Sequence, residues 1–241
     1  MTEGVGVEIL SCLARVERQR ELRGASPTLS HSTQALKAFQ QERFRRAYAD
    51  LLADPRHSGA ARFFLEELYG PADFSRRDAQ FQRIVRPLVR LFPQEVVNTV
   101  LHLAQLHALS EELDSEMAHC LPAHEPGGLL NANHYVAAWR QVGRQSDRAQ
   151  QIELTLAVGR ALDVYTRKPL LRHALRLMRA PASAAGLQEL QAFLECGFET
   201  FRAMQGAERF LDTVGTREHR LAAELFEGDE AGQFCALMAW C

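Results

Sequence analysis

The stretch GLQELQAFLECGFETFRAM, residues 186–204, indicates the fold class of this chain. Its apolar side chains recur every three or four residues, at Leu187, Leu190, Leu194, Phe198 and Phe201. Because an α-helix has about 3.6 residues per turn, this spacing places them in one continuous apolar stripe. The stretch is therefore predicted to be a helix that buries one face against the rest of the protein.

The same spacing recurs along most of the chain and predicts an all-α protein. RAQQIELTLAVGRALDVY (148–165) repeats it at Ala149, Ile152, Leu156, Gly159 and Leu162. No segment alternates β-branched and polar residues as a half-buried strand does. Glycine, proline and capping residues divide the sequence into about nine or ten helices. We expect these helices to form one compact multi-helix bundle.

The strongest break in the helical pattern is PAHEPGG, residues 122–128. We expect a single all-α domain over residues 1–241, with possible lobes at 24–122 and 131–228 that meet near this break. The last residues, 229–241, form an apolar tail that ends in FCALMAWC. Such a tail is expected to pack on the core or to form a dimer contact.

Composition and charge argue against several classes of protein. The chain is 46% hydrophobic and 24% charged, as folded globular proteins are, and its net charge of -2 lacks the basic excess of a nucleic-acid binder. No segment approaches the ~18 apolar residues of a membrane span, and the N-terminus has no signal-peptide pattern. The five cysteines form no CxxC motif. We therefore expect a cytoplasmic protein that binds neither nucleic acid nor membranes.

The stretch LHLAQLHALSEELDSEMAHC, residues 101–120, contains the best candidates for a site. His107, Glu111 and Asp114 lie in one row of a helix, because they are four and three residues apart. Such a row could hold a divalent metal or pair a base with an orienting carboxylate, and His107 could also serve as a haem ligand. The alternative is a structural histidine whose ring nitrogen is satisfied by Glu111.

A second candidate site is a stripe of arginines on the helix predicted to begin near Ser75, where Ser75 and Asp78 have the form of a capping box. We call this set the arginine surface: Arg76, Arg83, Arg86 and Arg90. The opposite, apolar face consists of Phe81, Ile84, Val85, Leu88 and Phe92. Guanidinium groups match carboxylate and phosphate, so this surface is a candidate for an acidic protein partner or an anionic ligand. The alternative is a solvated face paired with acidic neighbours.

Two longer segments carry a resemblance to a known family. RFFLEELYGPADFSRRDAQFQRIVRPLVRLFP (62–93), followed by LAQLHALSEELD (103–114), resembles a family of helical proteins, bacterial and largely proteobacterial, known as a domain of unknown function. PASAAGLQELQAFLECGFETFRAM (181–204) and AERFLDTVGTRE (207–218) are similar to the C-terminal half of the same proteins. The resemblance covers about residues 30–220. It implies a helical fold and a bacterial, cytoplasmic setting, and no activity, cofactor or catalytic residue.

No motif of nucleophilic or phosphate chemistry accompanies these residues. The sequence contains no GxSxG, no glycine-rich phosphate loop and no HExxH. We therefore expect a non-enzymatic binding or regulatory module, without a cofactor, that acts through its helix surfaces on a protein partner or on a second copy of itself as a homodimer. The alternative is a metal- or haem-dependent protein with a site around His107, Glu111 and Asp114.

Overall fold

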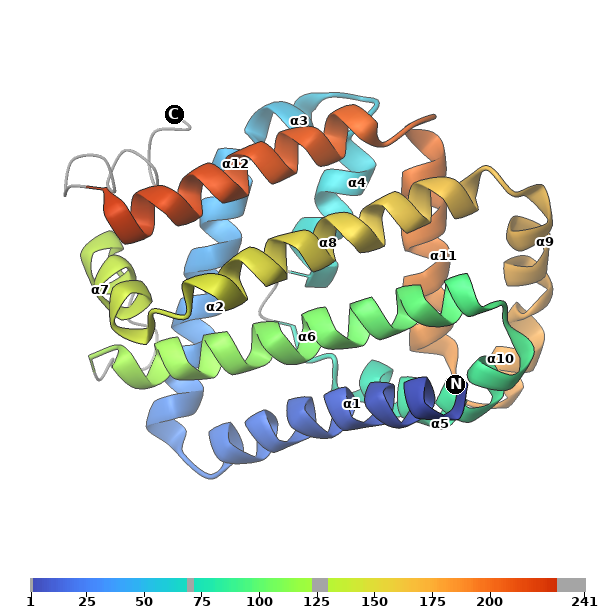
Figure 1. The fold of residues 1–241 in the computed structure, drawn as a ribbon, viewed down its shortest axis with the longest axis horizontal. Helices are drawn as coiled ribbons and strands as arrows, with labels where there is room; N and C mark the ends of the chain where they lie inside the picture. The colour runs from blue at the N-terminus through green and yellow to red at the C-terminus, as the bar shows by residue number, and fades with distance from the viewer. Residues whose placement is uncertain (1, 69–71, 123–129, 229–241) are drawn as a thin grey trace.

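The predicted all-α fold is confirmed. The computed structural model describes residues 2–68, 72–122 and 130–228, and these ranges are helical apart from short connections (Figure 1). No strand occurs within them. The apolar tail over 229–241 and most of the break over 122–128 lie outside the described residues.

The described residues form the following helices in chain order. The first half of the chain forms α1 (Thr2–Gly24), α2 (Pro27–Ala47), α3 (Ala49–Ala53), α4 (Ser58–Phe63), a π-helical turn η1 (Phe64–Leu68), α5 (Ser75–Leu91) and α6 (Gln94–Cys120). The second half forms α7 (Ala132–Val142), α8 (Gln145–Thr166), α9 (Pro169–Leu177), α10 (Arg179–Ala184), α11 (Gln188–Ala203) and α12 (Glu208–Glu227).

Capping side chains set the starts of two helices. Ser26 begins α2 and Asn131 begins α7, and each side chain accepts a hydrogen bond from the backbone N–H three residues further on. The expected capping box at Ser75 does not form. Instead Asp73 accepts from the backbone N–H of Ser75 at 2.9 Å and from its hydroxyl at 3.0 Å. Asp78 is thereby released for contacts with other helices.

The long helices are arranged in two crossing layers (Figure 1). Helices α1, α6, α8 and α12 run side by side, and α2, α4 and α11 cross behind them. α6 and α8 pack against each other in opposite directions at the centre of the first layer. No helix within the described ranges is long and apolar enough to cross a bilayer.

An aromatic cluster lies where the two layers meet near α4 and α11. The ring of Phe64 lies 6.4 Å from that of Phe201 and 5.4 Å from that of Phe210, centroid to centroid. Tyr48 and Phe44 belong to the same buried cluster. Residues from both halves of the chain thus share one core, and the division into lobes stays a prediction.

Candidate functional site

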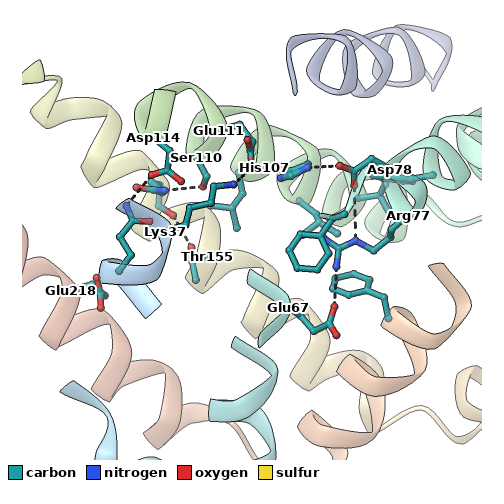
Figure 2. Close-up of a pocket in the computed structure, with 18 of the residues that line it drawn as sticks. Lys37, Glu67, Arg77, Asp78, His107, Ser110, Glu111, Asp114, Thr155 and Glu218 are labelled. Carbon is teal, nitrogen blue, oxygen red and sulfur yellow. Dashed lines mark hydrogen bonds and ion pairs between the residues drawn. The ribbon is translucent and has the colours of Figure 1, made fainter. Parts of the chain in front are cut away.

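A cavity of about 180 Å³ lies in the interior, walled by side chains of η1 and of α2, α5, α6, α7, α8, α11 and α12 (Figure 2). One water molecule needs about 10–15 Å³ by this kind of measure. The cavity is therefore large enough for a small organic molecule. We call it the polar cavity, because charged and amide side chains lie among the apolar residues of its wall.

Helix α6 supplies one polar side of this wall. His107, Ser110, Glu111 and Asp114 all line the cavity, as the helical spacing of the predicted row requires (Figure 2). The structure thus brings the three predicted residues to one cavity wall. Their side chains do not converge on one point, however, because each bonds to a different neighbour.

His107 is held by a partner on another helix. Its Nε2 lies 2.7 Å from Oδ2 of Asp78 on α5, so this ring nitrogen is satisfied by Asp78 and not by Glu111, the partner given in the alternative interpretation. Arg20 of α1 forms an ion pair with the same carboxylate. Burial raises the pKa of Asp78, but the contacts with His107 and Arg20 outweigh it, and the pKa is lowered. Asp78 is therefore a carboxylate that fixes the orientation of the imidazole.

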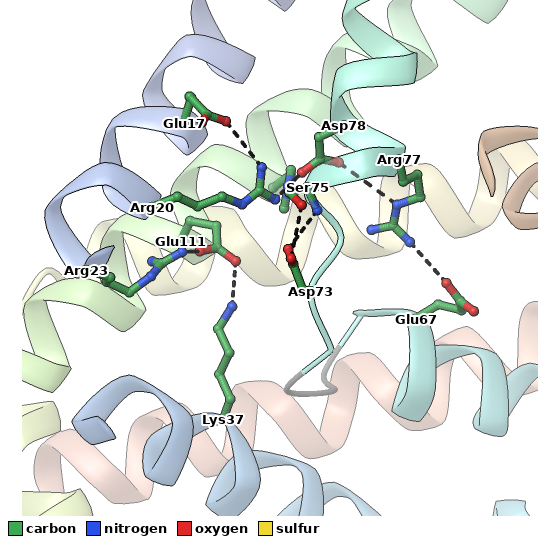
Figure 3. A network of polar contacts seen from close by, with 11 residues as sticks. Glu17, Arg20, Arg23, Lys37, Glu67, Asp73, Ser75, Arg77, Asp78 and Glu111 are labelled. Atoms are coloured by element: carbon green, nitrogen blue, oxygen red, sulfur yellow. Dashed lines mark hydrogen bonds and ion pairs between the residues drawn. The ribbon is translucent and has the colours of Figure 1, made fainter. Parts of the chain in front are cut away.

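Glu111 lies between two cations (Figure 3). Lys37 Nζ of α2 is 2.6 Å from Oε1, and Arg23 Nη2 of α1 is 2.5 Å from Oε2. Burial raises the pKa of Glu111, and the two cations outweigh it and lower the pKa to about 2. Glu111 is therefore ionised and already paired on both oxygens.

The end of the polar cavity near Asp114 presents uncharged hydrogen-bonding groups beside the charged side chain of Arg148. Asp114 accepts a hydrogen bond from Gln40 Nε2 at 2.9 Å, and burial raises the pKa of its carboxyl group, which favours the uncharged form. Gln151 Nε2 of α8 donates to Ser110 Oγ at 2.8 Å. A carboxyl, a hydroxyl and two amides therefore line this end.

A second cavity of about 160 Å³ adjoins the first. We call it the apolar cavity. The two cavities share the wall residues Val100, Leu103, Leu106, Thr155, Phe193 and Leu194. Phe63, Phe64 and Phe201 continue the wall of the apolar cavity. Its two remaining polar residues, Thr99 and Tyr165, bond to each other at 2.9 Å between their hydroxyl oxygens.

The two cavities together change from polar to apolar along α6 and α8. On α6 the polar end is at Asp114 and the apolar end at Val96; on α8, which runs the opposite way, they are at Arg148 and Tyr165. The helices therefore place their polar ends together and their apolar ends together. At 1.5 Å per residue, the wall along α6 from Val96 to Asp114 is about 27 Å long.

A metal site at His107, Glu111 and Asp114 has no geometric support. Within the described residues, no group of three or more His, Cys, Asp or Glu side chains is arranged to hold a metal ion. The three side chains instead contact Asp78, the cations Lys37 and Arg23, and Gln40. Metal or haem ligation stays a prediction.

The arginine surface is divided by its contacts. Arg76 reaches Glu189 at 3.4 Å, and Arg83 donates to the backbone oxygen of Ala185 at 2.7 Å, so these two tie α5 to the segment around α10 and α11. The side chains of Arg86 and Arg90 are exposed and make no hydrogen bond or ion pair with any described residue.

Phe92 was expected on the buried face of α5 and is instead half-exposed, as the neighbouring Leu91 is largely exposed. The reason is local. The helix ends at Leu91, and Phe92 adopts an extended backbone conformation that turns it away from the apolar stripe.

Several residues of the cavity wall were missed by sequence reasoning: Lys37, Gln40, Asp78, Arg148 and Gln151. Asp78 was assigned to a cap. Gln40 carries a weak signal, since it stands four residues from both Leu36 and Phe44 and so interrupts an apolar stripe. A buried amide in such a position requires a hydrogen-bonding partner, and Asp114 provides it.

Fold and site together define an all-helical protein with an interior that is polar at one end and apolar at the other. The chain belongs to the family described as Domain of unknown function (DUF8198), whose model matches residues 19–232. The resemblance read from the sequence is thus confirmed as far as the family and its helical fold. No curated protein and no solved structure matches the chain.

Proposed function

We propose that this protein is a non-enzymatic binding module that takes a small ligand into the two adjoining cavities along α6 and α8. The observation that carries the proposal is the pair of cavities, of about 180 and 160 Å³, with six wall residues in common. Protein interiors are close-packed, with few voids larger than a water molecule, and empty volume lowers stability. Adjoining voids of this size are therefore best accounted for by a ligand.

The side-chain contacts favour binding over catalysis. The His107–Asp78 pair could orient a general base, but catalysis by a nucleophile also needs a hydroxyl or thiol within hydrogen-bonding reach of that base. Among the described residues no hydrogen bond joins His107 to Ser110, whose hydroxyl accepts from Gln151 instead. The wall thus offers fixed hydrogen-bonding groups and no activated nucleophile.

Native mass spectrometry on protein purified without detergent tests this proposal. We expect a bound adduct that organic extraction removes. The variant Leu103→Trp should lose the adduct, because Leu103 lines both cavities and a larger ring there obstructs the place where they adjoin. Leu91→Trp is the matched control, since Leu91 is 78% exposed and lines neither cavity. Wild-type protein that carries no adduct and takes none up from a lipid extract would contradict the proposal.

A second candidate function is association through the arginine surface, as the sequence suggested. It is favoured by Arg86 and Arg90, which are exposed and make no polar contact with the described residues. Exposed apolar residues at Leu91 and Phe92 adjoin them. Such a mixed arginine and apolar patch is typical of the contact residues in protein interfaces.

Arg86→Glu combined with Arg90→Glu tests this second function by sedimentation equilibrium. We expect the wild type to self-associate at micromolar concentration and the double variant to be monomeric. Arg18→Glu with Arg160→Glu makes the same charge change at exposed positions on α1 and α8 and should leave association unchanged. Equal association of wild type and the α5 variant would exclude this surface.

A further inference from the structure

We infer that the ligand is a single-chain amphiphile with an uncharged, hydrogen-bonding head, which lies between Ser110, Asp114 and Gln151 while the chain extends past Leu103 toward Phe201. This inference rests on the proposed function and names the class of ligand. It is carried by the order in which polar and apolar residues follow one another along the cavity walls.

The shape of the two cavities suits a slender molecule. They meet at a shared wall that includes Leu103 on α6 and Thr155 on α8, two helices packed against each other along their length. The wall along α6 extends about 27 Å from Val96 to Asp114 at the helical rise per residue. A molecule that occupies both cavities therefore extends along α6 and α8, as an alkyl chain with a polar head can.

The end of the apolar cavity near Phe201 does not suit a polar group of the ligand. Phe63, Phe64 and Phe201 line the apolar cavity there, and the hydroxyls of Thr99 and Tyr165 satisfy each other at 2.9 Å. A polar group placed at this end would be desolvated without a hydrogen-bonding partner, which is unfavourable. An alkyl chain is favoured, because it gains from burial against these side chains.

The end of the polar cavity near Asp114 suits an uncharged head. Ser110, Asp114 and Gln151 provide a hydroxyl, a buried carboxyl and an amide. The neighbouring ions form pairs, with Glu111 between Lys37 and Arg23 and, on α12, Glu218 paired with Arg43.

Lys37, Arg23 and Arg43 already pair with carboxylates, and Glu111 and Glu218 already pair with cations, so a head of either charge would gain no counter-ion from these residues. Hydroxyl or ester groups can instead donate to and accept from the side chains at this end. Arg148 lies in the same wall, stacked on Trp139 with its guanidinium carbon 4.0 Å from the ring centroid. It would favour an anionic head, and the test below therefore includes one.

Three probes with the same ten-carbon chain separate these alternatives: 1-monodecanoylglycerol, decanoate and decyltrimethylammonium. Trp139 lines the polar cavity, so its fluorescence in the full-length Trp240→Phe protein reports binding without a second tryptophan. All titrations stay below the micelle concentration of each probe. We expect the glycerol ester to bind at least tenfold more tightly than either charged probe.

Two variants locate the head. Asp114→Leu and, separately, Ser110→Val should each weaken binding of the glycerol ester at least fivefold, with helical content checked by circular dichroism. If Asp114→Leu does not fold, Ser110→Val alone tests the position of the head. Asp212→Leu, at an exposed position on α12, is the matched control and should retain the affinity.

The outcomes separate the inference from the proposed function. Preference for decanoate or decyltrimethylammonium, or equal binding of all three probes, overturns the uncharged head and leaves ligand binding in place. Unchanged affinity in both head variants also overturns it. If no probe binds and the purified protein carries no adduct, the proposed function itself fails.

Discussion

Glu111 keeps a full negative charge in the interior because two cations reach it from different helices. Lys37 and Arg23 contact its two oxygens, and the carboxylate side chain is only 9% exposed. Removing ions from water is unfavourable, so such a group is stable only while its partners remain in place. The three residues also fix α1, α2 and α6 relative to one another at one end of the polar cavity.

We therefore expect Glu111→Gln to lower the free energy of unfolding at pH 7 by about 3 kcal/mol. The folded-state pKa of Glu111 is lowered from 4.5 to about 2, so its contribution is present above about pH 4.5 and is lost as the pH falls through about 2. The difference between wild type and variant should shrink over that interval. Urea unfolding followed by circular dichroism at several pH values measures it.

The control for this experiment is Glu95→Gln, at an exposed position in the first turn of the same helix. It should shift stability by less than about 0.5 kcal/mol at any of these pH values. A constant difference between wild type and Glu111→Gln from pH 7 to pH 2 would show that the charge of Glu111 is not what stabilises the fold.

At the scale of elements, α8 and α12 approach closely because each contributes a glycine to the crossing. A Cβ atom at Gly159 would lie 2.5 Å from Leu211 Cδ2, and one at Gly215 would lie 3.0 Å from Leu156 Cδ1. A leucine side chain of the opposite helix thus packs against each glycine. This reciprocal contact fixes the position of α12 along the axis of α8, next to the apolar cavity that Gly159 lines.

Gly215→Val should lower the free energy of unfolding by about 1–3 kcal/mol, because the added methyl groups overlap Leu156 in a packed interface. Gly4→Val is the matched control, since a Cβ at Gly4 meets no atom within 4 Å. Chemical denaturation measures both. Adding Leu156→Ala to Gly215→Val should recover part of the loss, and a purely additive double variant would argue against the contact.

At the scale of the whole molecule, the two crossing layers enclose volume that their side chains do not fill. α6 and α8 line it on one side, and α2 and α11 line it on the other (Figures 1 and 2). Internal voids disappear on unfolding, so they make a folded protein more sensitive to pressure. The cavities should therefore be visible in the volume change of unfolding.

We predict that Leu103→Trp makes the unfolding volume change of the ligand-free protein less negative, by on the order of 10 mL/mol. High-pressure fluorescence provides the measurement, with Leu91→Trp as control because Leu91 is exposed. Equal volume changes in the two variants would mean that the cavities are not empty in the ligand-free protein.

The amino-acid sequence by itself determined the all-α fold and the placing of His107, Glu111 and Asp114 on one face of α6. These features depend on interactions within one or two turns. Backbone hydrogen bonds join residues four apart, and apolar spacing selects the buried face of each helix. Such local features can therefore be predicted from a single sequence.

The tertiary structure alone decided the partners of those side chains. His107 pairs with Asp78, 29 residues away, and Glu111 with Lys37, 74 residues away. The two adjoining cavities, one polar and one apolar, arise in the same way, because they require α6 and α8 to run in opposite directions beside α2, α5 and α11. Helical periodicity shows which face of a helix is buried, but it does not show which other helix packs against that face.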